Sequence, residues 1–308
     1  MKQSHTAMLL RALAPQEGYN LTALAGVRVL RSDRPLTDTP VLYDPGIVIV
    51  GQGAKRGNFG GDTYVYDTQH YLAVSVPVPF TMQSDGSAAK PLLALYMHLD
   101  FTMAAELLLQ LDGEGSPASA HAPRSMVSSP MDADMQASVQ RLLEVLGRPV
   151  EARVLGPAAV REVYFRVLTG PQGPALRAAL ALKGHFGRIG KALKRIHAGY
   201  AAPLSLAQLA AEAGMSVPSF HNHFKAVTQT SPMQYVKSTR LHQARLLMAR
   251  EDMTAAAACH AVGYESASQF SREFKRLFGL TPAAEAQRMK ADFALPPALP
   301  DSGFVSSH

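Results

Sequence analysis

The sequence predicts an α+β protein: a small N-terminal β-barrel with helices after it, then an all-α domain of two helix-turn-helix units joined by a long helix. Short β-branched segments bounded by Gly, Pro and Asp lie between residues 26 and 80, and helical periodicity follows from residue 131. A helix–glycine–helix pattern then occurs twice after residue 204. With 308 residues, 47% of them hydrophobic and 18% charged, the chain is long enough for about two folded domains and is not disordered in composition.

The basic charge of the chain is concentrated in one segment. The net charge is +6, and residues 191–290 hold 13 Lys and Arg against 6 Asp and Glu, whereas the remainder holds 17 against 18. Segregated positive charge is the electrostatic signature expected of a domain that binds a polyanion such as a nucleic acid.

Cysteine content and hydropathy indicate a cytoplasmic protein. Cys259 is the only cysteine, which excludes an internal disulfide framework. The apolar stretch at the N-terminus is interrupted by Arg11 and lacks a convincing cleavage site, and no segment reaches the roughly 18–20 apolar residues of a membrane span. We therefore expect a cytoplasmic location and no membrane contact.

The N-terminal part is predicted to be a small antiparallel barrel over residues 1–125. Four segments are β-branched or aromatic and partly alternating, at the close spacing typical of such barrels: GVRVL, GIVIVGQG, DTYVYDTQHY and YLAVSVPVPF. A helical segment, FTMAAELLLQL (101–111), follows them. Residues 112–125, rich in Gly, Ser, Ala and Pro, are expected to be a surface loop.

Residues 126–182 are predicted to be helical. One helix is expected in MDADMQASVQRLLEVLG, with an acidic first turn and an end at Gly147 and Pro149, and a second in VREVYFRVLTG (160–170). The pair could form a dimer face or pack within its own domain, and the sequence leaves both readings open. A helical domain is expected over 183–290, with a flexible tail over 291–308.

The basic segment contains an internal repeat with an offset of 50 residues. GMSVPSFHNHFKAVTQTSP (214–232) matches GYESASQFSREFKRLFGLTP (263–282), with Phe220 and Phe224 in the places of Phe270 and Phe274. Each copy follows a short helix pattern, so two helix-turn-helix motifs are predicted at 206–227 and 254–278.

Local chemistry supports each motif. Ser216 and Ser266 are positioned to cap the second helix of each unit, and phenylalanines at i and i+4 share one helix face. QYVKSTRLHQARLLMARE (234–251) reads as a single helix joining the two units. Two such units can enter major-groove segments about one helical turn, roughly 34 Å, apart.

With these residues in view, 191–285 resembles the DNA-binding domain of the AraC/XylS family of bacterial transcription regulators. YDPGIVIVGQGAK (43–55) and REVYFRVLTGPQG (161–173) are similar to a subgroup with its own N-terminal regulatory domain. The resemblance implies a cupin-like barrel that senses a small-molecule effector, a helical segment often used for homodimerisation, and promoter or operator DNA as partner. It also implies contact with RNA polymerase, and activation more than repression.

The resemblance assigns contacts residue by residue. The base-facing positions of the family fall on Ser219, His221, Asn222, Ser268, Gln269 and Arg272, and candidates for phosphate contact are Lys225, Lys237, Arg240, Lys275 and Arg276. Arg272 is suited to guanine; Asn222, where the family commonly has an arginine, is suited to adenine. For each residue the solvated-face interpretation stays open beside a direct contact.

The scaffold helix of the second motif departs from the family pattern. Ala255 and Ala258 stand where larger side chains are usual, and the position near Glu285 is commonly aromatic. Each missing Ile-sized side chain costs about 2–5 kcal/mol if nothing refills the space. The hypothesis is that the second unit is held less rigidly than the first and orders fully on DNA.

Other chemistry is weaker in this sequence. The histidines of His221-Asn222-His223 point apart on a helix, so a shared metal ion is not expected there. No P-loop, dinucleotide fingerprint or nucleophile elbow is present, and we expect no catalytic residue, metal or cofactor. Tyr64, Tyr66 and Tyr71 are the candidates for an effector pocket. The alternatives are a ligand-independent dimeric DNA-binding protein and a barrel enzyme with an accessory DNA-binding domain.

Single residues of interest remain. His70 and His98 are expected to be ordinary core or surface histidines, and Cys259 is expected to be a small buried residue, with a redox role as the minority interpretation. Gln52 and Lys55, in a glycine-rich stretch read as a hairpin loop, match residues that recur in the subgroup. Their role does not follow from the sequence.

Overall fold

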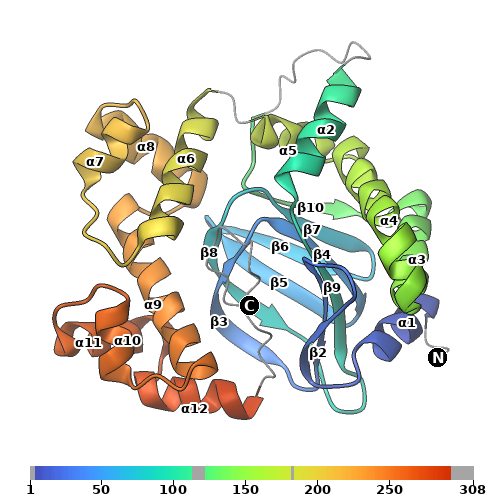
Figure 1. Cartoon of the computed structure of the whole chain (residues 1–308), viewed down its shortest axis with the longest axis horizontal. Helices are drawn as coiled ribbons and strands as arrows, with labels where there is room; N and C mark the ends of the chain where they lie inside the picture. Colours follow the sequence, from blue (N-terminus) through green and yellow to red (C-terminus); the bar gives the residue numbers. More distant parts are fainter. Residues whose placement is uncertain (1–3, 113–121, 182–183, 293–308) are drawn as a thin grey trace.

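The computed structural model describes residues 4–112, 122–181 and 184–292, and combines a curled antiparallel sheet, a layer of helices and a C-terminal helical domain (Figure 1). The strands are β1 (Gly18–Leu21), β2 (Val27–Ser32), β3 (Leu36–Tyr43), β4 (Gly46–Gln52), β5 (Ala54–Phe59), β6 (Asp62–Asp67), β7 (His70–Val74), β8 (Val78–Ser84), β9 (Leu92–His98) and β10 (Met126–Pro130).

The strands form one sheet in the order β1-β2-β9-β4-β7-β6-β5-β8-β3, with β10 paired to β7. Each of these pairs is antiparallel. The sheet curls into a half-barrel (Figure 1), which confirms the expected antiparallel architecture. Because β10 belongs to it, the sheet continues past residue 125.

The sheet is apolar on both faces, and β4 shows how one strand serves both. Val48 and Val50 face the inside of the curl, whereas Ile47 and Ile49 face the helical layer. Successive side chains of a strand point to opposite faces, so the continuous apolar run GIVIV produces a strand buried on both sides.

Five helices cover the outer face of the sheet (Figure 1). They are α1 (His5–Leu13), α2 (Phe101–Asp112), α3 (Ala133–Leu146), α4 (Pro149–Thr169) and α5 (Gly173–Leu180). The helices expected near 101–111 and 131–147 are confirmed. α4 begins at Pro149 and not at residue 160. Proline is tolerated at this position because the backbone N–H groups of the first helical turn have no intrahelical acceptor, so the N–H that proline lacks is not missed.

The C-terminal domain is all-helical, as expected. Its elements are α6 (Gly184–Gly199), α7 (Leu206–Glu212), α8 (Val217–Thr228), α9 (Pro232–Arg250), α10 (Ala255–Ala261), α11 (Ala267–Phe278) and α12 (Pro282–Asp292). The expected domain boundary at 182–183, the loop residues 113–121 and the tail residues 293–308 lie outside the described residues. Within the described part of the chain, no helix has both the length and the apolar character needed to cross a membrane.

The C-terminal domain docks against the open side of the curled sheet (Figure 1). The Tyr235 hydroxyl of α9 donates to the Pro77 carbonyl at 3.0 Å and lies 2.7 Å from His197 Nε2. Burial lowers the pKa of His197 to about 3, so the imidazole is neutral near pH 7. Because the Tyr235 hydroxyl donates its one proton to Pro77, it accepts from His197 in the tautomer that carries the proton on Nε2. Nearby, the Ser125 hydroxyl donates to the Val227 carbonyl at 2.6 Å. The interior of the sheet and the core of the first helix-turn-helix unit thus form one apolar cluster.

Candidate nucleic-acid interface

The first helix-turn-helix unit consists of α7 and α8, and each helix begins at a serine. The Ser205 hydroxyl accepts from the backbone N–H of Gln208 at 3.2 Å, and the Gln208 side chain accepts from the Ser205 N–H, forming a capping box. Ser216 caps α8 by accepting from the Ser219 N–H at 3.5 Å. Gly214, with φ +62°, makes the turn between the helices.

The second unit repeats this construction in α10 and α11. Thr254 caps α10, and the Ser266 hydroxyl caps α11 by accepting from the Gln269 N–H at 3.2 Å. Gly263 in the turn has φ +83°, and a Cβ there would lie 2.2 Å from the Ala201 carbonyl oxygen. This position therefore requires glycine for both conformation and space.

Paired phenylalanines fix the rotation of both second helices, as the repeat predicts. The rings of Phe220 and Phe224 lie 5.4 Å apart and those of Phe270 and Phe274 lie 5.5 Å apart, all four buried. Phe278 extends the second stack, with its ring 4.5 Å from Phe274. Because the aromatic face points inward, the polar residues of α8 and α11 face solvent.

The expected base-reading residues lie in the N-terminal halves of α8 and α11. Asn222, Ser268, Gln269 and Arg272 are exposed, and Ser219 and His221 are half-buried. Recognition helices contact bases mainly through their N-terminal residues. Each of the six residues is therefore on a stretch of helix that a groove can receive.

The five expected phosphate-contact residues fall into two groups. Lys225, Lys275 and Arg276 are exposed and form no ion pair with the residues that the structure describes. Lys237 and Arg240 are half-buried and engaged within the protein: Lys237 Nζ donates to Glu273 Oε1 at 2.9 Å.

Glu273 organises the inner side of α11. It accepts from Lys237, from the Tyr264 hydroxyl at 2.7 Å and from Gln269 Nε2 at 3.1 Å. Burial acts to raise the pKa of Glu273, but these hydrogen bonds hold it below its usual range. The contact with Glu273 thus fixes the position of the Gln269 side chain on α11.

Arg240 serves the protein interior and not the exposed face. Its Nε donates to the Tyr200 carbonyl at 2.7 Å, and its two terminal nitrogens donate at 3.0 Å to the carbonyls of Gly263 and Ala202. The guanidinium fork therefore ties α9 to the segment before α7 and to the turn of the second unit. This geometry corrects the expected phosphate contact, because the donors point at backbone oxygens.

The three tyrosines expected to line an effector pocket separate in the structure. Tyr66 is fully buried inside the curl, and Tyr64 packs at its edge. Tyr71 lies on the opposite face, beneath the helical layer, which corrects its expected place in the interior. Strands β6 and β7 pair only at Asp67 and His70, and β7 then pairs with β4 and β10. The face that a β7 side chain occupies therefore does not follow from the alternation of side chains along β6.

Lys55 occupies the interior beside Tyr66. Its Nζ donates to the Tyr43 hydroxyl at 2.8 Å and lies 5.4 and 5.7 Å from the ring centres of Tyr43 and Tyr66. Lys55 is part of β5 and not of a hairpin loop, and burial lowers its pKa to about 7. Gln52 donates to the Pro91 carbonyl at 2.7 Å, a structural contact between β4 and the start of β9.

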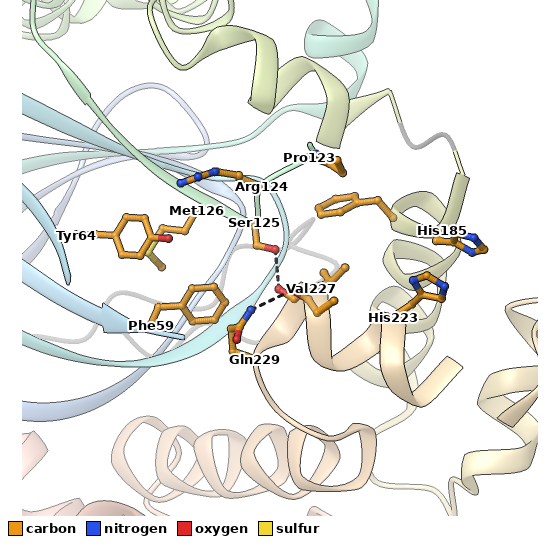
Figure 2. A pocket seen from close by; sticks show the side chains of 12 residues that line it. Phe59, Tyr64, Pro123, Arg124, Ser125, Met126, His185, His223, Val227 and Gln229 are labelled. Carbon is orange, nitrogen blue, oxygen red and sulfur yellow. Dashed lines mark hydrogen bonds between the residues drawn. The ribbon is translucent and has the colours of Figure 1, made fainter. Parts of the chain in front are cut away.

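A pocket of about 320 Å³ lies between the sheet and the first helix-turn-helix unit (Figure 2). Tyr64 and Arg124 line it from the sheet side, and His223 and Val227 line it from α8. Neither Arg124 nor the α8 side of this pocket was predicted from the sequence. No local pattern marks them, because the segments that meet here are about a hundred residues apart, as the 102-residue separation of the Ser125–Val227 hydrogen bond illustrates.

The remaining histidines and the cysteine have ordinary surroundings. His70 pairs with Asp67 at 3.1 Å, and burial lowers the pKa of His98. His223 stacks on His185, with ring centres 3.8 Å apart. Cys259 is buried and its thiol lies 3.7 Å from the Tyr264 carbonyl; burial raises the pKa of the thiol. Among the described residues, no group of three His, Cys, Asp or Glu could hold a metal ion.

Two family models match the chain. Residues 23–175 match the N-terminus of AraC-type transcriptional regulators, and residues 209–288 match a helix-turn-helix domain. The matches correspond to the sheet with its helical layer and to the two units described above.

Curated relatives match part of the chain. The MmsAB operon regulatory protein of Pseudomonas aeruginosa is 35% identical over 89 residues, 29% of this chain and 29% of that protein. The regulator ExsA of the same organism is 26% identical over 130 residues, 42% and 46% of the two chains. The activator VirF of Yersinia enterocolitica is 26% identical over 150 residues, 48% and 55% of the two chains. The chain thus spans between 29% and 55% of the length of these relatives.

A solved structure shares the fold over both domains. ToxT from Vibrio cholerae, solved with an unsaturated fatty acid bound, aligns with a TM-score of 0.59 at 10% identity, covering 88% of this chain and 97% of that one. At this identity the likeness concerns the fold alone.

Proposed function

Because the chain belongs to the AraC family of transcription regulators, we propose that it binds promoter DNA sequence-specifically, with α8 and α11 in adjacent major-groove segments. One observation carries the proposal: two capped helix-turn-helix units in register, held on one helix, α9, with their polar faces exposed. The charge excess of residues 191–290 supplies the attraction to phosphate.

The residues divide by chemistry into base readers and phosphate contacts. Arg272 donates two parallel hydrogen bonds to guanine, and Asn222 pairs with adenine through its amide. Ser219, His221, Ser268 and Gln269 complete the base-reading set. Lys225, Lys275 and Arg276 contact phosphate and set the register without reading sequence.

Control by a small-molecule effector is the second part of the proposal. Support comes from the continuous apolar cluster that joins the interior of the sheet to the first helix-turn-helix unit. A change of packing inside the sheet would therefore alter the packing of that unit. The ToxT fold neighbour carries a fatty acid, which makes a bound apolar acid compatible with this architecture. Membership of the AraC family also favours activation of transcription through contact with RNA polymerase.

Homodimerisation through α4 is the third part. Val150 and Val154, one turn apart on α4, are 65% and 71% exposed, and Leu155 beside them is 50% exposed. Such a stripe suits a second copy of the same helix. Val154→Glu should convert a dimer to a monomer in light scattering, and an unchanged mass would reject α4 as the dimer face.

The DNA-binding proposal is tested by selection from a random duplex library with the full chain. The expected result is an enriched motif of two parts about 10 base pairs apart, one for each recognition helix. Retention of DNA with no enriched motif would show that the basic domain binds DNA without reading it, and would overturn the proposal.

A further inference from the structure

The side chain of Gln269, an expected base reader on α11, is hydrogen-bonded within the protein. Its Nε2 donates to Glu273 Oε1 at 3.1 Å, and Glu273 lies one helical turn further along the same helix. Because Gln269 is exposed, the rest of its amide stays open to a base.

Glu273 is held in place by two other parts of the C-terminal domain. Lys237 Nζ, from α9, donates to Glu273 Oε1 at 2.9 Å. The Tyr264 hydroxyl, from the turn before α11, donates to Glu273 Oε2 at 2.7 Å. The Glu273 side chain is 13% exposed, so it cannot swing into a groove without breaking both contacts.

These contacts also fix the charge of Glu273. Burial acts to raise the pKa of Glu273, but the hydrogen bonds from Tyr264, Lys237 and Gln269 lower it below its usual range. Burial and the contact with Glu273 raise the pKa of Tyr264, so the tyrosine hydroxyl keeps its proton and donates it. At neutral pH Glu273 is therefore a carboxylate, which accepts hydrogen bonds and has none to donate.

The carboxylate decides which end of the Gln269 amide faces it. A carboxamide has donors on its nitrogen and an acceptor on its oxygen, and a rotation of 180° exchanges the two ends. If the amide oxygen faced Glu273, two acceptors would meet and the hydrogen bond would be lost. The nitrogen therefore stays on Glu273, and Oε1 of Gln269 is left for a base.

An acceptor in the major groove selects bases by their amino groups. Adenine and cytosine, the amino bases, present N6 and N4 amino groups there, whereas guanine and thymine, the keto bases, present carbonyl oxygens. Gln269 Oε1 accepts a hydrogen bond from an amino group and is repelled by a carbonyl oxygen. The second N–H of Nε2 remains available for adenine N7, so adenine is favoured over cytosine.

We infer that Glu273 is a positioning residue that makes Gln269 specific for an amino base, adenine before cytosine. The inference rests on the proposed function and deepens it by assigning a base class to one position of the site that α11 reads. A glutamine without such a partner accepts either class of base, because its amide is free to rotate. In this arrangement Lys237 and Tyr264 act on the carboxylate and not on DNA.

The test starts from a DNA site selected with the full chain. Selection repeated with Gln269→Ala identifies the base position that Gln269 reads, because the preference at that position disappears. Duplexes with each of the four bases at this position are then compared by fluorescence anisotropy. The wild type should bind the amino-base duplexes about 5- to 150-fold more tightly than the keto-base duplexes. Replacing adenine by purine, which lacks the 6-amino group, should remove most of this advantage.

Glu273→Gln is the variant that removes the fixed orientation. Its amide has both a donor and an acceptor, so either orientation of Gln269 finds a partner. Amino-base and keto-base duplexes should then bind within about 3-fold of each other, while the preference at the base read by Arg272 is kept. In the Gln269→Ala background, Glu273→Gln should change no base preference, because the residue through which it acts is gone.

Tyr264→Phe is the matched control. It removes a hydrogen bond from the same cluster but leaves the carboxylate on Gln269, so the preference for an amino base should remain. A loss of preference in Tyr264→Phe equal to that in Glu273→Gln would show that both residues only support the fold, and would overturn the inference. A preference unchanged in Glu273→Gln would overturn it as well.

The comparison of base classes uses the wild type and does not depend on the folding of any variant. A keto base at the position read by Gln269, or no position affected by Gln269→Ala, would overturn the inference and leave DNA reading by the chain intact. A selection without an enriched motif would overturn the proposed function and this inference together.

Discussion

Replacing Arg240 by lysine keeps the positive charge of α9 but removes its fork of donors. In the structure that fork donates to the carbonyl oxygens of Tyr200, Ala202 and Gly263 at 2.7, 3.0 and 3.0 Å. A single ammonium group in that position can reach one of these oxygens, so two hydrogen bonds are lost. Each charge-assisted bond contributes about 1.5–3 kcal/mol. Because Arg240 is half-buried, we take the lower value and expect Arg240→Lys to lower the free energy of unfolding by about 3 kcal/mol.

Thermal unfolding followed by circular dichroism measures this effect. For a cooperative unit of 150–250 residues, each kcal/mol lowers Tm by about 2–4 °C, so Arg240→Lys should melt about 6–12 °C below the wild type. Arg276→Lys is the matched control, because Arg276 is exposed on α11 and should leave Tm unchanged. An unchanged Tm for Arg240→Lys would refute the structural assignment and return Arg240 to the phosphate contacts, where a lysine substitutes readily.

Three further predictions concern stability. Burial lowers the pKa of Lys55 from 10.5 to about 7, so the unfolded state binds more protons between these values and stability should rise with pH across that window. In urea titrations at pH 7, the free energy of unfolding of Lys55→Met should exceed that of the wild type by about 2–4 kcal/mol, and it should not rise between pH 7 and 10.5. A pH dependence like that of the wild type would contradict the prediction. Burial lowers the pKa of His197 from 6.5 to about 3 in the folded state, so below pH 6.5 the unfolded state binds more protons. The free energy of unfolding should therefore decrease by about 2 kcal/mol between pH 6.5 and pH 5. His197→Gln, which keeps a donor for Tyr235, should lose less between pH 7 and pH 5, and an equal loss would reject His197 as the cause. Without DNA, amide hydrogen exchange should be faster in α10 than in α7, and equal rates would count against a loosely held second unit.

The helix-turn-helix units could be predicted from the sequence because their determinants are local. The glycine turns, the capping serines and the phenylalanines at i and i+4 act within about twenty residues of each other, and the structure has each of them in its expected role. The strands were likewise recognisable from their β-branched composition. Ala258 and Cys259 of the scaffold helix α10 are fully buried in the same core cluster as Phe270.

Contacts between distant segments could not be predicted. Arg240 has the charge and exposed helix pattern of a phosphate contact, but its three acceptors come from segments 23 to 40 residues away. Tyr71 lies under the helical layer although Tyr66 lies inside the curl, and this follows from the pairing of β7 with β4 and β10. Arg124 and Val227 meet only because the C-terminal domain docks on the sheet, and nothing in either segment alone encodes that meeting.

The central claim, that α11 reads base sequence, is tested most directly by Arg272→Ala on the selected DNA site and on a scrambled site of equal length. Loss of a bidentate contact to guanine should cost about 1–3 kcal/mol on the selected site and relax the preference at one base position. The scrambled site should be affected far less. Lys275→Ala is the control: it should weaken both sites equally and reduce the salt slope by about 1. Equal losses on both sites for Arg272→Ala would contradict base reading by this helix.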